Sequence, residues 1–337
     1  MKGLGTVIRY IARRLGYTFV MLGVLSVLVY GIFSVLPIDP AALTCGKSCT
    51  PAVIEANRHR LGYDLPMIQQ YLNFAKGIFV GRTYGTGDIA FTCPAPSFGY
   101  SFNQNACVTD LIKSAIPVTL SMAIGAVFMW LAIGIGLGVL AARFKNTILD
   151  TLSTGFVLVG TSFPTFLSGL LLFLFVVLKW QLLPFSLGGF TSPLDDFHAW
   201  FTQMLLPWIT LALLFSAIYA RFTRSSVLET STEDYVRTAR AKGVREGTIL
   251  GKHVLRAALA PIITMAGMDF AGLLGGAIIT ESIFNLPGLG RLAIASVYEY
   301  DLPVIVATTL LAAGIVIVAN LVVDVLYAFV DPRVRVA

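Results

Sequence analysis

The sequence predicts an all-α protein that crosses a membrane several times. Of its 337 residues, 56% are hydrophobic and only 12% are charged, whereas a soluble domain carries about 25% charged residues. Apolar stretches long enough to cross a hydrocarbon core of about 30 Å recur along the chain. A soluble domain is excluded, because so little polar surface would leave large apolar areas in contact with water.

Six apolar stretches are expected to form membrane-spanning helices. A helix needs about 20 apolar residues to cross the bilayer, and only the fourth stretch is clearly shorter. We expect it to continue past Arg221, whose side chain can reach the membrane surface. Pro164 should kink the third stretch. The six stretches are Leu15–Leu36, Ile116–Ala142, Leu149–Leu178, Leu205–Tyr219, Leu259–Phe284 and Pro303–Val330.

Basic residues predict how the chain is oriented. If the amino terminus lies in the cytoplasm, the inner segments hold 16 of the 24 lysines and arginines. The short outer loops 179–204 and 285–302 hold one each, Lys179 and Arg291. Because short cytoplasmic loops are enriched in Lys and Arg, both termini are expected in the cytoplasm. The net charge of +6 therefore reflects topology, and no nucleic-acid partner is expected. The inner segments are 1–14, 142–148, 220–258 and 331–337.

Residues 37–112 are expected to form an extracytoplasmic cap inserted between the first two spans. Residues 1–36 then hold the amino terminus and the first helix, and residues 113–337 form the transmembrane core with the remaining helices. The cap segment is polar and contains all four cysteines of the chain. Proximity favours two disulfides, Cys45–Cys49 and Cys93–Cys107, which would staple a cap with little core of its own. The other two pairings stay open, as does a tetrahedral metal site.

The sequence shows no catalytic constellation. The tripeptide Gly46-Lys47-Ser48 resembles the end of a phosphate-binding loop, but Ala41 stands where that loop needs a glycine. The three histidines lie in separate segments, and neither a nucleophile elbow nor a zinc-binding helix is found. We therefore expect no catalytic residue, no bound metal and no cofactor. An intramembrane hydrolase is the enzymatic alternative.

The long cytoplasmic loop 221–258 has an organised pattern. Glu233 and Asp234 are expected to start a helix, since acidic residues favour its positive end, and Gly243 to stop it. A second helical stretch, from Glu246 to Leu259, would lead into the membrane at Pro261. Within the first helix, the sequence predicts an apolar stripe made of Tyr235, Val236, Ala239 and Val244.

This loop helix suits docking into a groove on another protein. Thr238, Ala239 and Gly243 are small residues that would allow close approach of a partner. The alternative interpretation is a solvated basic connector between two spans.

The same loop resembles the signature of the binding-protein-dependent permeases of the ABC importer superfamily. That signature reads E-A-A, three residues, G, nine residues, then I-x-L-P. Here Arg237, Thr238 and Ala239 occupy the first three places, and residues 253–256 read H-V-L-R. Residues 235–243 read Y-V-R-T-A-R-A-K-G, which is typical of the peptide and nickel branch.

The resemblance extends along nearly the whole chain. Residues 281–290 read E-S-I-F-N-L-P-G-L-G, close to the branch motif E-T-x-F-x-x-P-G-L-G, and Asp331-Pro332-Arg333 fits its close. Arg60-Leu61-Gly62 resembles the branch's first outer loop. Together these motifs identify the chain as resembling the B-type permease of dipeptide and oligopeptide importers.

The resemblance implies a type I ABC importer permease fold and a non-catalytic subunit that imports peptides across a bacterial cell membrane. It implies four kinds of partner: a second, C-type permease subunit, two ATPases that bind ATP and Mg, an extracytoplasmic solute-binding protein and the lipid bilayer. Nickel, glutathione or haem are alternative substrates within the family. The loop helix would couple to the ATPases through Tyr235, Arg237, Thr238, Ala239, Arg240, Lys242, Gly243 and His253.

Charged residues inside spans point to a translocation path. Asp269, about halfway along the fifth span, would either line a wet cavity that meets a peptide amine or hydrogen-bond a neighbouring helix. In an ion-gradient-driven secondary transporter, the alternative function, Asp269 would carry protons. Glu281, Phe284 and Pro287 belong to the motif that the resemblance places at the outer gate. Close helix packing is expected at glycines, namely Gly134, Gly136, Gly138, Gly272, Gly275 and Gly276.

Overall fold

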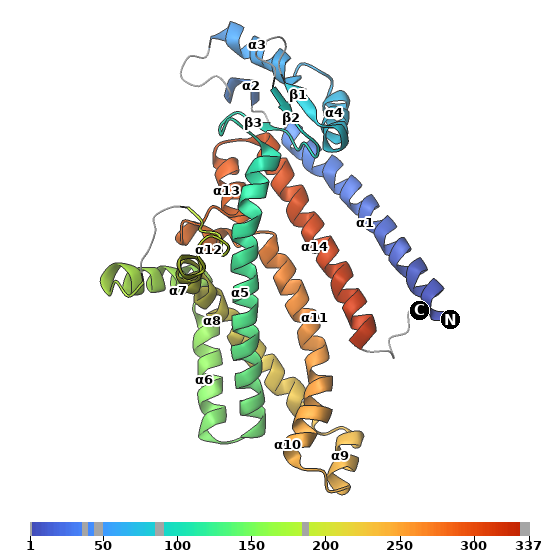
Figure 1. Cartoon of the computed structure of the whole chain (residues 1–337), viewed down its shortest axis with the longest axis vertical. Coiled ribbons are helices and arrows are strands. Elements are labelled where there is room, and N and C mark those ends of the chain that lie inside the picture. The colour runs from blue at the N-terminus through green and yellow to red at the C-terminus, as the bar shows by residue number, and fades with distance from the viewer. Residues whose placement is uncertain (1, 36–39, 44–49, 85–90, 184–188, 331–337) are drawn as a thin grey trace. The chain divides into compact units, whose positions relative to one another are not determined.

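The computed structural model describes residues 2–35, 40–43, 50–84, 91–183 and 189–330 (Figure 1). The predicted pair Cys45–Cys49 lies outside these residues. The chain divides into two compact units. The first unit comprises residues 1–118 and 287–317, and the second comprises residues 119–286 and 318–337. Two long helices, α5 (Val108–Arg143) and α14 (Leu302–Val330), contribute residues to both units.

The first unit contains the first apolar helix and the cap. Its strands pair as two antiparallel hairpins, β1 with β2 and β3 with β4. These strands are two or three residues long, and the described chain is mostly helical, as the sequence predicts. The elements are α1 (Lys2–Val35), α2 (Pro40–Leu43), α3 (Pro51–Leu61), α4 (Met67–Val80), β1 (Arg82–Tyr84), β2 (Phe91–Cys93), β3 (Tyr100–Ser101), β4 (Ala106–Cys107) and α13 (Leu289–Tyr298).

The cap has a small core closed by a disulfide. Cys93 at the end of β2 is bonded to Cys107 at the end of β4, with 5.7 Å between their Cα atoms. This is one of the two disulfides that proximity favours. Because both sulfurs are bonded to each other, they do not form a four-thiolate metal site. Next to the disulfide, four aromatic rings pack against one another, with centroids 4.1 to 6.4 Å apart. They belong to Tyr84, Phe91, Tyr100 and Phe102.

The second unit is a helical bundle. Its helices pack mainly around α8, which contacts α6, α7, α11 and α12. Besides its part of α5, the elements are α6 (Ile148–Ser162), α7 (Thr165–Leu172), the π-helix η2 (Phe173–Lys179), α8 (Phe197–Thr230), α9 (Asp234–Ala241), α10 (Glu246–Thr248), the π-helix η3 (Ile249–Val254), α11 (Leu255–Leu274) and α12 (Ile278–Ile283).

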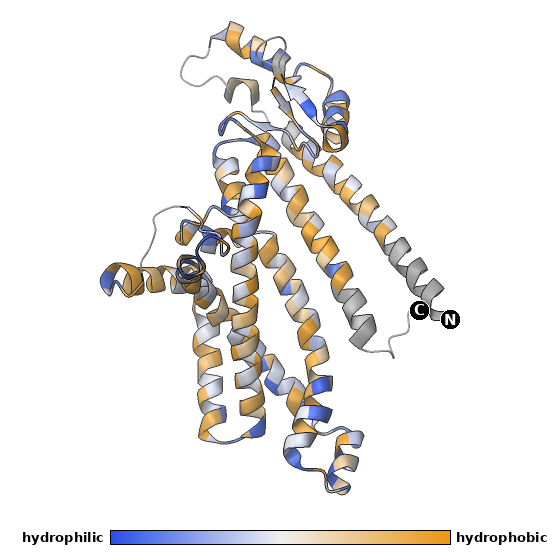
Figure 2. Ribbon diagram, viewed as in Figure 1, coloured by the Kyte–Doolittle hydropathy of each residue, from blue (hydrophilic) through white to orange (hydrophobic). Residues whose placement is uncertain are grey.

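Within the described residues, five helices are long and apolar enough to cross a membrane, and a sixth span results if one bent pair is counted. Figure 2 shows the apolar residues concentrated along these helices. The bent pair is Ile148–Ser162 and Thr165–Lys179, which meet at 96°. Pro164 lies at this break, so the predicted kink is present as a full interruption. The fourth span continues to Thr230, past Arg221, as predicted.

Glycines on α5 allow α8 to approach closely. A Cβ atom added at Gly138 would lie 2.5 Å from Cβ of Thr223, and one at Gly134 would lie 2.6 Å from Cβ of Tyr219. The predicted close packing is therefore confirmed at these two positions. Added Cβ atoms at Gly136 and Gly272 would have no neighbour within 4 Å, so within the described residues these two glycines do not serve packing.

Candidate coupling helix and polar residues of the bundle

The helix α9 forms where the sequence predicts a loop helix. Its first turn carries Asp234, a favourable position for a negative charge at the positive end of the helix. Its end is a Schellman motif: the amide of Gly243 donates to the carbonyl of Arg240, and that of Val244 donates to the carbonyl of Ala239. Gly243 has a φ of +74°, a left-handed conformation that glycine adopts without steric cost.

The inward face of α9 is anchored to the bundle. Val236 is fully buried and Ala239 is 9% exposed. They pack in a core with Val227 of α8 and Val254, the last residue of η3. Burying one valine side chain contributes about 1.5–3 kcal/mol, so this core holds an eight-residue helix that would be marginal in isolation. Figure 1 shows α9 beside α10 at one end of the bundle.

An ion pair closes the loop that follows α9. Nε of Arg240 donates to Oε1 of Glu246 at 2.8 Å, and Nη2 donates to Oε2 at 3.4 Å. Nη1 of Arg240 also donates to the carbonyl of Ser231 at 3.2 Å. Arg240 therefore links the segments before and after α9, and it is a positioning residue within the loop.

The outward face of α9 is exposed. Tyr235 is 46% exposed, and the side chain of Arg237 is 69% exposed. Thr238, Lys242 and Gly243 are exposed as well. Of the predicted stripe, Val236 and Ala239 are buried and Val244 is half-buried, but Tyr235 points away from the core.

Two expectations for the loop need correction. Ala239 was expected on a surface that a partner approaches, yet it is buried in the chain's own core. An added Cβ atom at Gly243 would meet nothing within 4 Å, so within the described chain the need for glycine there is conformational. His253 is half-buried and lies outside α9, in the π-helix η3 that packs against it.

Asp269 hydrogen-bonds a neighbouring helix. The hydroxyl of Tyr219 on α8 donates to Oδ2 of Asp269 on α11 at 2.7 Å. This is the second of the two roles that the sequence left open. Asp269 is half-buried, and a carboxylate without such a donor would be costly in a membrane. The bond ties α8 to α11 and gives Oδ2 of Asp269 a donor.

Glu281 is also held by a hydrogen bond within the second unit. Its side chain is fully buried, and Oε1 accepts a bond from the Thr119 hydroxyl at 2.7 Å. Phe284, one turn later, is 2% exposed and packs edge-on against Phe173, with ring centroids 6.2 Å apart. Pro287 is exposed and belongs to the first unit.

A salt bridge that sequence reasoning missed joins α6 to α8. Nε and Nη2 of Arg224 donate to the two carboxylate oxygens of Asp150 at 2.7 and 2.9 Å, and the backbone amide of Asn146 donates to the same carboxylate at 3.0 Å. Asp150 is 7% exposed. The available signal was an acid at the start of the third span and an arginine at the end of the fourth, both on the predicted inner side.

The comparisons with known proteins settle the family. Residues 134–336 match the family described as binding-protein-dependent transport system inner membrane component, and residues 7–123 match its N-terminal domain. The chain belongs to this family. It is therefore a membrane-embedded permease subunit of an ABC importer, as the loop motif predicts.

Full-length relatives agree. The chain is 38% identical over 328 residues to the glutathione transport system permease protein GsiC of Escherichia coli strain K12, covering 97% of this chain and 99% of the relative. It is 32% identical over 326 residues, with the same coverage, to the probable peptide ABC transporter permease protein y4tP of Sinorhizobium fredii. Such permeases are transport components, and family membership favours an ATP-driven importer over an ion-gradient-driven transporter.

A solved structure supports the fold. The MetNI methionine ABC transporter in an inward-facing conformation matches 66% of this chain and 97% of its own, with a TM-score of 0.53 and 19% identity. The type I permease fold inferred from the sequence is consistent with this match.

Proposed function

We propose that this permease subunit imports peptides and that α9 is the helix through which separate ATPase subunits move it. The observation that supports this most strongly is the division of α9 into two faces. One face is anchored through Val236 and Ala239, while the other presents Tyr235, Arg237, Thr238 and Lys242 outside the chain. A partner that binds the outward face would move the bundle, because the inward face packs against α8 and η3.

The rest of the assembly follows from the family. The chain would pair with a second, C-type permease subunit, and each of the two would contact one ATPase that binds ATP and Mg. Closure of the two ATPases would bring the coupling helices together and tilt the spans. An extracytoplasmic solute-binding protein would deliver the substrate, and both chain termini would lie in the cytoplasm, as the basic residues predict.

Peptides are the proposed substrate for two reasons. The sequence 235–243 is typical of the peptide and nickel branch, and one relative is a probable peptide permease. Another relative is a glutathione permease, and glutathione is itself a tripeptide. Among the alternatives, glutathione is therefore favoured over nickel and haem.

A cross-linking experiment tests the role of α9. All four cysteines precede residue 108, so a cysteine placed in the loop is distinguishable by position. In the reconstituted transporter with Cys45 and Cys49 replaced by alanine and the Cys93–Cys107 disulfide kept, Thr238→Cys should cross-link to an ATPase subunit, and ATP should change the yield. Thr248→Cys, a matched exposed threonine in α10, should cross-link much less.

The refuting result is equally specific. If Thr238→Cys forms no ATPase adduct in a complex that transports peptide, α9 is not the contact. Substrate identity is tested separately by ATP-dependent uptake of labelled di- and tripeptides, with nickel and haem as competitors. Uptake of nickel with no uptake of peptide would refute the peptide assignment and leave the coupling role intact.

A further inference from the structure

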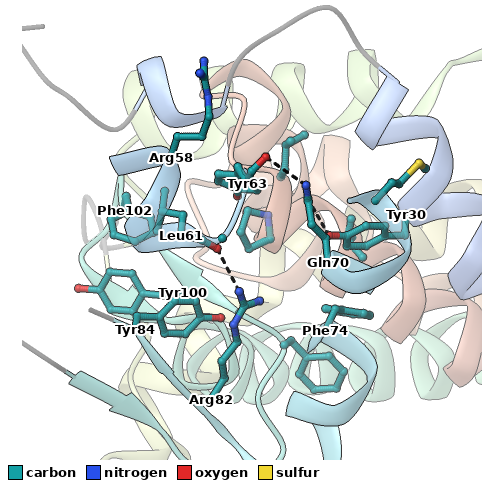
Figure 3. A pocket seen from close by; sticks show the side chains of 17 residues that line it. Tyr30, Arg58, Leu61, Tyr63, Gln70, Phe74, Arg82, Tyr84, Tyr100 and Phe102 are labelled. Carbon is teal, nitrogen blue, oxygen red and sulfur yellow. Dashed lines mark hydrogen bonds between the residues drawn. The ribbon is translucent and has the colours of Figure 1, made fainter. Parts of the chain in front are cut away.

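The first unit contains a cavity of about 230 Å³ that none of the residues discussed for coupling or translocation lines. Its walls come from the cap, from the later part of α1 and from the start of α14 (Figure 3). The side chains that determine its chemistry are Tyr30, Tyr63, Gln70, Phe74, Arg82 and Tyr100.

One wall is held rigid by Gln70. Its Nε2 donates to the carbonyls of Tyr63 and Leu65 at 3.2 and 2.8 Å, and its Oε1 accepts a bond from the Tyr30 hydroxyl at 3.4 Å. Figure 3 shows Gln70 between Tyr63 and Tyr30. Gln70 thus fixes the turn between α3 and α4 and has little capacity left to bind anything else.

Arg82, unlike Gln70, still has hydrogen-bonding capacity to offer a ligand. It is half-buried, and its Nη2 donates to the Leu61 carbonyl at 3.0 Å. Its guanidinium lies over the Tyr84 ring, 4.8 Å from the centroid. A guanidinium has five N–H donors, and within the described residues no carboxylate lies within 4 Å of this one. A half-buried positive charge is costly unless an anion accompanies it.

A second donor lines the same cavity without an acceptor. The hydroxyl of Tyr63 has no hydrogen-bond partner in the part of the chain that the structure describes. Burial raises the pKa of Tyr63 above its ordinary value, in spite of the opposing effect of Arg82. The hydroxyl therefore stays protonated at neutral pH and can donate. Among the described residues, Asp301 is the carboxylate that acts on Tyr63, and it already accepts a hydrogen bond from Ser101. The described part of the cavity therefore offers a positive charge and a neutral donor to an anion.

The remaining walls are flat and aromatic. Phe74 lies 5.6 Å from Tyr30, ring centroid to ring centroid, on one side. On the other, Tyr100 lies 4.8 Å from Phe102. Aromatic faces with a few placed polar groups are characteristic of small-molecule sites. The cavity volume of about 230 Å³ suits a group the size of one amino acid.

We propose that this cavity binds a small molecule that carries an anionic group beside a flat apolar group. The anion accepts hydrogen bonds from Arg82 and Tyr63, and the apolar group lies between Phe74 and Tyr100. Free carboxylates, such as the terminal residue of a peptide, and anionic lipid headgroups share this chemistry. The proposal does not require peptides to be the transported substrate.

Phenylacetate is a suitable probe because it joins a carboxylate to one ring. We would titrate it against the full chain in nanodiscs of phosphatidylcholine and measure Kd by calorimetry. Arg82→Gln keeps a donor for the Leu61 carbonyl but removes the charge, and it should weaken binding about ten- to hundredfold. Lys113→Gln removes an exposed cation outside the cavity and should leave Kd unchanged. Benzyl alcohol, which lacks the anion, should bind as weakly as phenylacetate binds Arg82→Gln.

A second variant guards against misfolding. Leu302→Trp fills the cavity from α14 with Arg82 intact, and it should abolish binding. Peptide mapping of the Cys93–Cys107 disulfide verifies that the cap has folded in each variant. Absence of saturable phenylacetate binding, or equal affinity in wild type and Arg82→Gln, overturns the proposal.

A third arm identifies the natural source of the anion. Nanodiscs that contain phosphatidylglycerol repel phenylacetate through their negative surface, so this comparison is made at high salt, which screens that repulsion. A weaker apparent affinity of wild type there shows that a lipid headgroup competes for the cavity, and an unchanged affinity favours a soluble carboxylate.

Discussion

Gly243 should be a position in the loop that is sensitive to substitution for a purely conformational reason. Its φ of +74° is left-handed, and a Cβ atom in that conformation costs about 1–2 kcal/mol. Gly243→Ala introduces this cost at the end of α9 without a steric clash, because the space around the new Cβ is empty to 4 Å. The equilibrium between the ordered and frayed helix end should shift by about five- to thirtyfold.

The chain supplies a matched control nearby. Gly247 lies in α10, and an added Cβ there would also meet nothing within 4 Å. Its backbone is helical, so Gly247→Ala should stabilise the segment by about 0.5–1 kcal/mol. The same chemical change a few residues apart is therefore predicted to have opposite signs. Gly243→Asn should have a small effect, because asparagine tolerates the left-handed region.

Hydrogen exchange of the amides in residues 234–244 measures the effect directly. Gly243→Ala should exchange faster there than wild type, and Gly247→Ala should exchange at the same rate or more slowly. In the complete transporter, substrate-stimulated ATP hydrolysis should fall only in Gly243→Ala. Equal exchange in the two alanine variants would refute the conformational explanation for this glycine.

Three further predictions concern other parts of the chain. Arg224→Gln leaves Asp150 without its bidentate partner and should destabilise the bundle by about 2–3 kcal/mol. Breaking a fully buried ion pair would cost more, but Arg224 is partly exposed. Thermal unfolding in detergent measures this change, and no loss of stability would show that the pair contributes nothing. Replacing Cys93 and Cys107 together by alanine should destabilise the cap by about 3 kcal/mol, because the disulfide closes a loop between residues that are 14 positions apart. Limited proteolysis should then cut the cap first, and an unchanged cleavage pattern would contradict this. Burial raises the pKa of Asp301, although a hydrogen bond from Ser101 opposes the shift. The folded state thus binds the proton more tightly, and the stability of the fold should fall as pH rises from the ordinary carboxyl pKa through the raised one. Hydrogen exchange in residues 100–107 should show this pH dependence, and Asp301→Asn should remove it.

The spans and the loop helix could be predicted because both are local properties of the chain. Long apolar runs specify membrane helices by length alone. The expected loop helix between Glu233 and Gly243 matches α9 (Asp234–Ala241) closely, because an acidic start and a glycine stop are both short-range signals. Pro164 likewise marks the break in the third apolar stretch, but the angle of 96° depends on how the two pieces pack.

The orientation of individual side chains was harder to predict. Ala239 is small and apolar, so it fits both an exposed contact surface and an inward stripe. Only its neighbours in the folded chain, Val227 and Val254 among them, show that it faces inward. The bond between Tyr219 and Asp269 and the pair Asp150–Arg224 join residues 50 and 74 positions apart, a separation that no local pattern encodes.

The cap was the least predictable region. Its polar, glycine-rich composition indicates an ordered segment only through its cysteines. The strands of the two hairpins are two or three residues long, which is too short for an alternation of apolar and polar residues to be recognised. The cavity around Arg82 depends on segments from α1, α4, β1 and α14, so no stretch of sequence contains it.

Uptake by reconstituted vesicles tests most directly whether this chain is a passive conduit moved by ATPases. Proteoliposomes would contain either the purified chain alone or the chain with its partner permease, both ATPases and the binding protein. Labelled tripeptide should accumulate only in the complete system, and only with ATP on the side of the ATPases. Accumulation against a gradient by the chain alone, or ATP hydrolysis by the chain alone, would contradict this role.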